Sequence, residues 1–307
     1  DRPLFDRVLQ GQYPPGSIIK PLFGLAALES GVINKEYKIY DPGFYQLKNK
    51  KHKYRDWKKG GHGSNIYLRD AIIQSCDTFF YNIGVQMTID TLSLYGSRFG
   101  LGQKTGIDMP AERAGIMPSR AWKKGARGLA WYPGDTVNAS IGQGFTLTTP
   151  MQLAVATARM ASRGEIRAPQ LVRKQHTVLP PTGYIQASES NWNYIHQAME
   201  DVVHYRRGTA HKISQGLSYH IAGKTGTAQV VGIKQDEEYD AEMVAKRNRD
   251  HALFIAFAPV ENPKIAISVI VENGEHGSSI AAPVARKFID AYMSYYPEAL
   301  GVESVTP

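Results

Sequence analysis

Apolar residues in the first part of the chain form runs with helical length, and the first run is the most continuous. Residues 18–28 are apolar nearly all round, which is typical of a buried central helix. The run is preceded by the turn-forming residues Pro14-Pro15-Gly16. Pro21 falls in the first helical turn, where a missing N–H is tolerated. The pattern therefore predicts that Ser17 lies at the N-terminus of a buried helix.

Further helices are expected along the chain. Thr149-Pro150-Met151-Gln152 reads as a capping box with proline at the first helical position, and it predicts a helix over 150–162. Residues 40–64 carry glycine, proline, lysine and aromatic residues without periodicity, which predicts a long irregular excursion. The other predicted helices cover residues 68–74, 79–87, 192–205 and 281–295.

The pattern changes to strands in the last third of the chain. Residues 219–231, 251–259 and 264–271 show alternation or short apolar runs suited to adjacent antiparallel strands. The polar stretch 234–250 is expected to be a mobile connection. Helices followed by a late sheet predict an α+β fold with a helical lobe and a sheet lobe, and no repeat or linker divides residues 1–307, so we expect a single domain.

Composition narrows the class of protein. The chain has 307 residues, of which 42% are hydrophobic and 21% charged, as in ordinary globular proteins. Its longest apolar runs fall short of the ~18 residues of a membrane helix, and no signal peptide is visible. The only cysteine, Cys76, excludes an intrachain disulfide and a cysteine-rich zinc module.

A net charge of +8 favours anionic partners. No nucleic-acid-binding signature accompanies this charge, so we expect no nucleic-acid partner, and a basic run of this kind is typical of a solvated loop. The charge is concentrated at Lys48, Lys50, Lys51, Lys53, Arg55, Lys58 and Lys59.

Ser17-Ile18-Ile19-Lys20 is the first candidate for chemistry. A lysine three residues after a serine on a helix shares its face and can reach the hydroxyl as a base. Lysine acts as a base only when burial or a neighbouring cation lowers its pKa, and Lys224 is a candidate for that cation. Helix N-terminal amides would favour the oxyanion that forms when Ser17 attacks a carbonyl. Standing alone, the motif would be a helix that happens to contain both residues.

Two later motifs add polar groups. Ser75-Cys76-Asp77 lies at a break between helical segments, where it reads either as part of a cleft or as an ordinary N-cap. Lys224-Thr225-Gly226-Thr227 lies on a predicted strand, where glycine allows close approach of a substrate and the Lys and Thr groups can hold a carboxylate. Alone, this segment could be a plain edge strand.

The three motifs, in this order, resemble the transpeptidase domain of class B penicillin-binding proteins. Tyr13-Pro14-Pro15-Gly16-Ser17, Ile141-Gly142-Gln143-Gly144 with Thr149-Pro150, and Gly223-Lys224-Thr225-Gly226-Thr227-Ala228 extend the resemblance over nearly the whole chain. Asp77 and three further segments are similar to the elongation subgroup, penicillin-binding protein 2, rather than to the division subgroup. These segments are Asp41-Pro42-Gly43, Tyr54-Arg55-Asp56-Trp57 and Gly61-His62-Gly63.

The resemblance implies a fold and an activity. The fold would be the α+β fold of penicillin-binding proteins and serine β-lactamases, with an antiparallel sheet lobe flanked by helices, a helical lobe, and the active serine at the N-terminus of a buried helix. The activity would be peptidoglycan D,D-transpeptidation, with stem peptides as substrates and β-lactams as inhibitors that trap the serine as a slowly hydrolysed ester. No cofactor is required for this acyl transfer.

The resemblance also implies roles for individual residues. Ser17 would be the nucleophile, Lys20 the general base and Ser75 the relay of a proton to the leaving nitrogen. Lys224 and Thr225 would bind the donor carboxylate beside Gly226, and the amides of Ser17 and Thr227 would form the oxyanion hole.

Asp77 departs from the asparagine of the broader family. An ionised carboxylate offers only acceptors and raises the pKa of a neighbouring lysine, which weakens the picture of Lys20 as a free base. We nevertheless predict that Asp77→Asn retains acylation by penicillin.

Elongation-type relatives are thought to carry zinc, and four residues match the positions. Asp41, Asp56, His62 and Cys76 are of the types that bind zinc, although the usual spacings of structural sites are absent. Otherwise Cys76 reads as a small buried residue beside Ser75. A structural zinc would tether residues 41–62 to the wall of the active site.

Two alternatives share part of this pattern: a serine β-lactamase, which also hydrolyses its acyl-enzyme, and a sensor domain that β-lactams acylate. For the transpeptidase, the resemblance implies an inner-membrane protein whose catalytic domain works in the periplasm with a SEDS-family glycosyltransferase and elongation-complex scaffold proteins. The membrane anchor, the pedestal region and the first strands of the sheet would precede the serine, and we expect them to lie outside residues 1–307.

Overall fold

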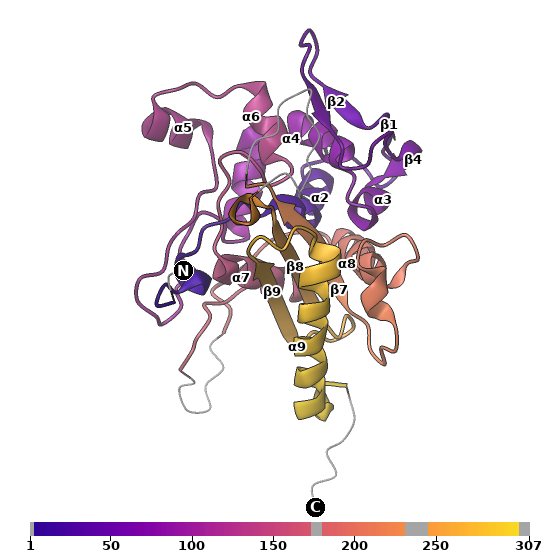
Figure 1. Cartoon of the computed structure of the whole chain (residues 1–307). Helices are drawn as coiled ribbons and strands as arrows, with labels where there is room; N and C mark the ends of the chain where they lie inside the picture. Colours follow the sequence, from indigo (N-terminus) through magenta and orange to yellow (C-terminus); the bar gives the residue numbers. More distant parts are fainter. Residues whose placement is uncertain (1–2, 173–179, 231–244, 301–307) are drawn as a thin grey trace, which may run out of the picture.

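The computed structural model describes residues 3–172, 180–230 and 245–300 and shows a sheet lobe beneath a helical lobe (Figure 1). The sheet contains β7 (Ala222–Ala228), β8 (His251–Ala258) and β9 (Ile265–Val271), which pair antiparallel in the order β7-β8-β9. The three predicted strands and their pairing are confirmed. Each strand is shorter than its predicted range, and residue 231 of the first range lies outside the described residues.

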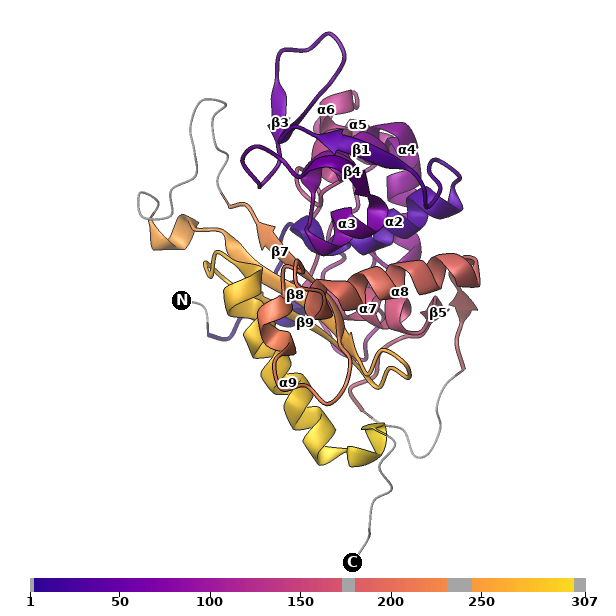
Figure 2. The ribbon, with the colours of Figure 1, turned by 90° about the vertical axis from the view of Figure 1, so that its right-hand side faces the viewer.

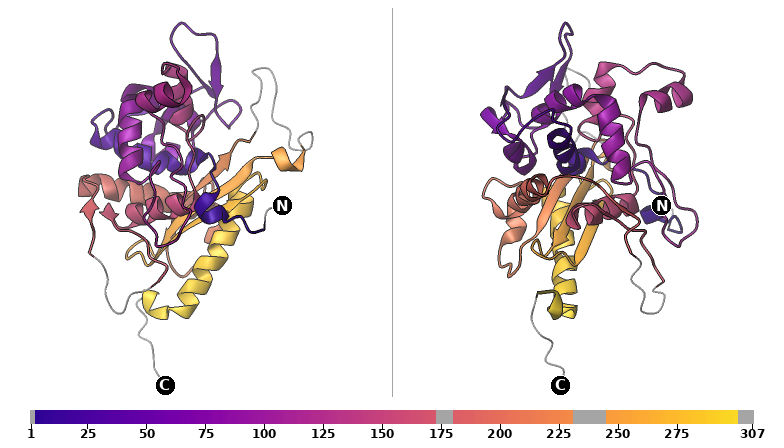
Figure 3. Two further views of the ribbon diagram at one scale, coloured as in Figure 1. Left: turned by 90° about the vertical axis from the view of Figure 1, so that its left-hand side faces the viewer. Right: turned by 180° about the vertical axis from the view of Figure 1, so that it is seen from behind.

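Helices cover both faces of this sheet (Figure 2). α7 (Pro150–Ala161) and α8 (Glu189–His204) lie on the face to which Phe257 of β8 points, where its ring packs against His196. α9 (Ala282–Tyr295) runs along the opposite face (Figures 2 and 3). The predicted capping box is present, since Gln152 N donates to Thr149 Oγ1 over 3.1 Å and Thr149 N donates to Gln152 Oε1 over 2.9 Å.

The predicted buried helix lies at the junction of the lobes. A 3₁₀ turn, η1 (Gly16–Ile19), leads into α2 (Lys20–Glu29), in which every residue except Glu29 is buried. The close packing of α2 depends on Gly24, where an added Cβ would meet Leu68 and Ile195 at 3.1 and 3.3 Å. Ser17 thus lies in the 3₁₀ turn just ahead of the α-helix.

The helical lobe contains α3 (Leu68–Ile73), α4 (Asp77–Arg98), α5 (Arg120–Arg127) and α6 (Pro133–Ala139). The helices expected over 68–74 and 79–87 are confirmed. α4 continues beyond Met87 after a break at Thr88, whose φ is 63°. α5 and α6 were not predicted, because α5 is mostly basic and exposed and α6 has only two full turns of sequence, so neither carries a long apolar stripe.

The expectation of an irregular excursion over 40–64 is wrong in part. β1 (Lys38–Asp41) pairs with β4 (Gly63–Tyr67), and β2 (Phe44–Gln46) pairs with β3 (Lys53–Arg55). These strands are short, and only Asp41 and Ile66 among their residues are buried, so they carry no sustained alternation of apolar and polar residues. The turns depend on Gly61 (φ +75°), where an added Cβ would lie 2.2 Å from the carbonyl oxygen of Asp41.

The remaining elements are short. Of the connection expected over 234–250, residues 234–244 lie outside the described residues. Within the described ranges, no helix combines the length and apolar character needed to cross a membrane. The short elements are α1 (Arg7–Gln10), β5 (Glu165–Ile166) paired with β6 (Gly183–Tyr184), η2 (His211–Ser214), η3 (Lys246–Asn248), η4 (Gly277–Ala281) and η5 (Pro297–Leu300).

Candidate active site

The turn that carries Ser17 aligns it with Lys20. The backbone N–H of Lys20 donates to the carbonyl of Ser17, which closes a 3₁₀ turn. Because side chains three residues apart eclipse in a 3₁₀ turn, both project from one side of the chain. Ser17 is half-buried, whereas Lys20 is fully buried.

The ammonium of Lys20 joins the second motif. Its Nζ donates to Asp77 Oδ1 over 2.6 Å, to the Ser75 carbonyl over 2.8 Å and to Ser75 Oγ over 3.3 Å. Asp77 is almost as buried as Lys20, so this is an interior ion pair rather than a solvated one. Lys20 therefore links the Ser17 turn to the wall formed by Ser75 and Asp77.

Ser75 adopts a backbone conformation unusual for its type. Its φ is 59°, and it occupies the break between α3 and α4. The segment Ser75-Cys76-Asp77 does supply the N-cap of α4, and the capping residue is Cys76, whose Sγ accepts the N–H of Phe79. Such left-handed conformations are costly for a residue with a Cβ and tend to occur at functional sites. The strain leaves the Ser75 hydroxyl within reach of Lys20.

The third motif places a second lysine in the interior. Lys224 of β7 is fully buried, and its Nζ donates to the Thr225 carbonyl over 3.1 Å. Burial, followed by repulsion from Lys20, holds the pKa of Lys224 well below its usual range, although Asp77 opposes the shift. Contacts bring the three motifs together: Lys20 bonds Asp77, and Gly226 in the same strand as Lys224 packs against Ile18 of η1.

Glycines seat the Ser17 turn against β7. Gly16 has a φ of +56°, and an added Cβ would lie 2.5 Å from the carbonyl oxygen of Thr227. At Gly226, an added Cβ would lie 2.7 Å from Ile18. In the structure it is therefore this chain's own η1 that approaches Gly226, and the predicted close approach of a substrate there stays a prediction.

Two contacts to the third motif were not predicted. Thr209 Oγ1 and Thr225 Oγ1 share a hydrogen bond of 2.7 Å, and Gln143 Nε2 donates to the Thr227 carbonyl over 3.3 Å. Thr209 follows α8 and meets β7 only through the fold, so no local pattern could have identified it. Gln143 belongs to the segment 141–144 that carries the resemblance, which was the one available signal.

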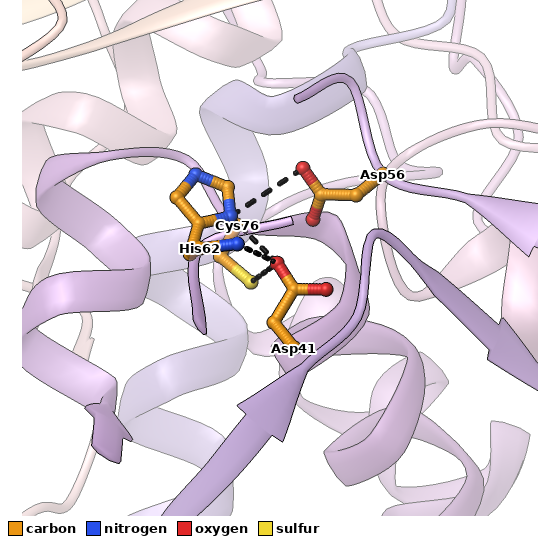
Figure 4. Close-up of side chains that lie close together, drawn as sticks. All are labelled: Asp41, Asp56, His62 and Cys76. Atoms are coloured by element: carbon orange, nitrogen blue, oxygen red, sulfur yellow. Dashed lines mark hydrogen bonds and ion pairs between the residues drawn. The ribbon is translucent and has the colours of Figure 1, made fainter. Parts of the chain in front are cut away.

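The four predicted zinc ligands lie together beside this site (Figure 4). Asp41 ends β1, Asp56 follows β3, His62 precedes β4 and Cys76 caps α4. One ligand atom from each lies within 4.8 Å of the others. His62 Nδ1 is 2.7 Å from Asp41 Oδ2 and 3.6 Å from Asp56 Oδ1, and Cys76 Sγ is 3.4 Å from Asp41 Oδ2. This buried cluster could hold a metal ion.

The charges of this cluster indicate what it would bind. Burial and then the carboxylates of Asp56 and Asp41 raise the pKa of the Cys76 thiol. Burial, followed by the charge of Asp77, raises the pKa of Asp56. These shifts reflect acidic groups packed together away from water, where ionisation is costly. A divalent cation between them would stabilise their ionised forms. The donor set of sulfur, imidazole and carboxylates suits zinc.

The fold and the three converging motifs define a family. The family model for the penicillin binding protein transpeptidase domain matches residues 1–290, and the chain belongs to that family. Peptidoglycan D,D-transpeptidase MrdA of Acinetobacter baumannii is 44% identical over 95% of this chain and 44% of its own length. MrdA of Escherichia coli is 40% identical over 95% of this chain and 47% of its own length. The chain thus spans about half the length of these relatives.

Solved structures of penicillin-binding protein 2 are also similar. That of Pseudomonas aeruginosa in complex with WCK 5153 has 45% identity and a TM-score of 0.86, covering 95% of this chain and 63% of that one. The structure of the Helicobacter pylori protein in complex with MreC has 35% identity and a TM-score of 0.84, and the match covers 96% of this chain and 52% of that chain. A peptidoglycan synthase complex that coordinates polymerization and crosslinking has 29% identity and a TM-score of 0.80, and the match covers 95% of this chain and 48% of that chain. The predicted likeness to penicillin-binding protein 2 is confirmed.

Proposed function

We propose that this chain is the catalytic domain of an elongation-type peptidoglycan D,D-transpeptidase. The observation that carries the proposal is the arrangement around Lys20, which follows Ser17 by one 3₁₀ turn of backbone and whose Nζ donates to both Ser75 and Asp77. The similarity to MrdA proteins and to penicillin-binding protein 2 supports it.

In the proposed reaction, Ser17 Oγ attacks the carbonyl carbon of the D-Ala-D-Ala amide, and Lys20 takes the hydroxyl proton. The amides of Ser17 and Thr227 stabilise the resulting oxyanion. The C–N bond then breaks, Ser75 passes a proton to the leaving nitrogen, and D-alanine departs. The acyl group, now an ester on Ser17, is transferred to an acceptor amine, which restores the serine.

Lys224 and Thr225 would hold the terminal carboxylate of the donor. An incoming carboxylate would favour the charged form of Lys224, whose pKa burial lowers in the free protein. Thr225 Oγ1 is oriented by its hydrogen bond with Thr209, so Thr209 would act as a positioning residue.

Replacing Thr209 with valine should remove this orientation. We expect acylation by a penicillin to slow by about threefold to tenfold, since one hydrogen bond contributes ~1 kcal/mol. Acylation by the methyl ester of the same penicillin, which lacks the carboxylate, should be slowed little by the substitution. Thr182→Val, which removes an exposed hydroxyl bonded to Ile166, is the control. An equal loss for the acid and the ester would contradict the positioning role.

Replacing Asp77 with asparagine should retain acylation by penicillin, to within about tenfold, because an amide oxygen can still accept from Lys20. The carboxylate also accepts the N–H of Trp57 over 3.1 Å, so some loss of stability is expected. Stopped-flow labelling of the folded variant measures the rate. Complete loss of acylation would show that the charge of Asp77 has a specific role.

Hydrolysis and cross-linking distinguish the proposal from its alternatives. A β-lactamase would turn over nitrocefin continuously, whereas a transpeptidase should stop after one slow acylation. A sensor would be acylated but would form no cross-links with lipid-linked precursor and a glycosyltransferase partner. Cross-linked product without sustained nitrocefin turnover is the expected result, and sustained turnover would favour the β-lactamase.

We propose that the metal held by Asp41, Asp56, His62 and Cys76 is zinc. Bound there, zinc would supply no step of the acyl transfer and would fix structure. Its ligands come from the segment 41–62 and from Cys76, which lies between Ser75 and Asp77. The ion would therefore anchor the excursion that contains β2 and β3 to the active-site wall.

Metal removal should lower stability. Protein purified without chelator is expected to contain zinc at a one-to-one ratio by elemental analysis, and chelation should lower the melting temperature by several degrees. His62→Asn should lose the metal, while His220→Asn, at a side chain that is 55% exposed, should keep it. Protein without stoichiometric zinc would end this part of the proposal.

We propose further that the domain works in the periplasm, attached to the inner membrane by a segment outside residues 1–307. Its partners would be a SEDS-family glycosyltransferase and elongation scaffold proteins. The similar structures that contain MreC and a peptidoglycan synthase complex support these partners.

A further inference from the structure

Within the sheet that the structure describes, β7 is an edge strand, and Thr227 lies one residue before its end. The carbonyl of Thr227 accepts a hydrogen bond from Gln143 Nε2 over 3.3 Å. Gln143 belongs to the segment between α6 and α7, which is not part of the sheet. The Thr227 carbonyl therefore points away from β8, toward the outer edge of β7.

The direction of this carbonyl also fixes the direction of the Thr227 N–H. Thr227 lies opposite Ala252 of β8. In an antiparallel ladder, two opposite residues either exchange both of their backbone hydrogen bonds or exchange neither. Because the Thr227 carbonyl bonds outside the sheet, this pair is of the second kind. The N–H of Thr227 thus faces the outer edge of β7 as well.

The turn that carries Ser17 lies against the same edge. At Gly16, directly before Ser17, an added Cβ would lie 2.5 Å from the Thr227 carbonyl oxygen and 3.6 Å from Gln143 Nε2. The N–H of Gly16 donates to the carbonyl of Gly142, next to Gln143, over 3.0 Å. The serine turn, the Gln143 amide and the outer edge of β7 are therefore in mutual contact.

The backbone around Gln143 is held on both sides. The N–H of Gln143 donates to the carbonyl of Asn138, near the end of α6, over 3.0 Å. Two residues further on, the ring of Phe145 packs against those of Trp122 and Trp131, with centroids 5.3 and 6.4 Å apart. These contacts present the Gln143 amide to β7 at a constant position.

We propose that Gln143 is a positioning residue for the acyl transfer, which holds the end of β7 so that the Thr227 N–H points at the oxyanion formed on attack by Ser17. This inference rests on the proposed function, in which the amides of Ser17 and Thr227 form the oxyanion hole. The ends of an element open more easily than its middle, and Thr227 is next to the last residue of β7. A donor fixed in advance stabilises the developing charge without reorganisation during the reaction. Gln143 would act through Thr227 and need not touch the substrate.

Replacing Gln143 with methionine tests the proposal, because methionine has a similar length and no N–H donor. The rate constant for acylation at saturating penicillin should fall by about tenfold, less than the ~10²- to 10³-fold expected for loss of an oxyanion-hole donor itself. The dissociation constant of the noncovalent penicillin complex should not change, because the oxyanion forms only on the way through the transition state. Stopped-flow kinetics over a range of penicillin concentrations separates the two constants.

Two companion variants complete the kinetic test. Gln143→Glu keeps the shape of the side chain but has no donor when ionised, so it should lose rate as the methionine variant does. It carries the test alone if Gln143→Met does not fold. The matched control is Gln46→Met in β2, since the Gln46 amide also donates to a backbone carbonyl, that of Lys50. This control should be acylated at the normal rate.

A spectroscopic measurement separates positioning from a general structural effect. Hydrogen bonds from the oxyanion hole polarise the carbonyl of the penicilloyl ester and lower its stretching frequency. With penicillin labelled with ¹³C at the β-lactam carbonyl, infrared difference spectra report this band alone. The band should lie at higher frequency in the Gln143 variants than in the unchanged protein, and it should not move in Gln46→Met.

Three results would overturn the proposal. They are an unchanged rate constant and an unchanged band in a folded Gln143 variant, a change confined to the dissociation constant, and an equal loss of rate in Gln46→Met. The unchanged protein tests the proposed function separately. If it forms no adduct on Ser17, the proposed function fails, whereas a normal adduct together with normal Gln143 variants removes only the role of Gln143.

Discussion

Replacing Ser17 with alanine is expected to abolish covalent labelling by penicillin. The hydroxyl oxygen of Ser17 is the atom that would form the ester, and alanine has no side-chain oxygen to form it. The fold should be retained, because Ser17 is half-buried and alanine suits a helical turn. Labelling with a fluorescent penicillin, followed by denaturing electrophoresis, measures the adduct.

Ser30→Ala is the matched control at the other end of α2. Ser30 is the C-cap of that helix, and its hydroxyl donates to the Ala27 carbonyl over 3.4 Å. This variant should label normally. Labelling of Ser17→Ala at the normal rate would mean that another residue is the nucleophile.

Replacing Lys20 with methionine should have two large effects. Acylation should slow by about 10²- to 10⁴-fold, the range expected for loss of a general base. The free energy of unfolding should fall by about 3–5 kcal/mol, because the variant leaves the Asp77 carboxylate buried without its cation. Methionine has a similar length and no charge, so a cavity contributes little to either effect. Acylation kinetics and urea unfolding measure the two effects separately.

The double variant Lys20→Met, Asp77→Asn separates catalysis from stability. Asparagine carries no charge, so part of the lost stability should return. Acylation should not return, because no base is restored. Normal acylation of Lys20→Met would contradict the role of Lys20, and an unchanged stability would contradict the importance of the buried ion pair.

The elements that the sequence predicted are those whose local chemistry agrees with the fold. Residues 18–28 are apolar nearly all round because α2 is enclosed, and the capping box at Thr149 marks the residue at which α7 begins. The strands over 38–67 escaped prediction because they are stabilised by backbone pairing and by contacts of Asp41 and glycines, which leave no periodic apolar pattern.

Some contacts of the candidate site could be predicted from the sequence, and others could not. Lys20, Ser75 and Asp77 could be predicted to meet because their motifs carry a family resemblance, and their contacts confirm that they do. The four predicted zinc ligands also lie together. Thr209 and the contact between Trp57 and Asp77 could not be predicted, because both depend on segments that only the tertiary structure brings into contact.

Site mapping after penicillin treatment tests the central claim most directly. The protein would be incubated with penicillin, digested, and sequenced by tandem mass spectrometry. A single penicilloyl adduct on Ser17 is the result that converging motifs around one serine predict. An adduct on Ser75 or any other residue, or a folded protein that forms none, would contradict it.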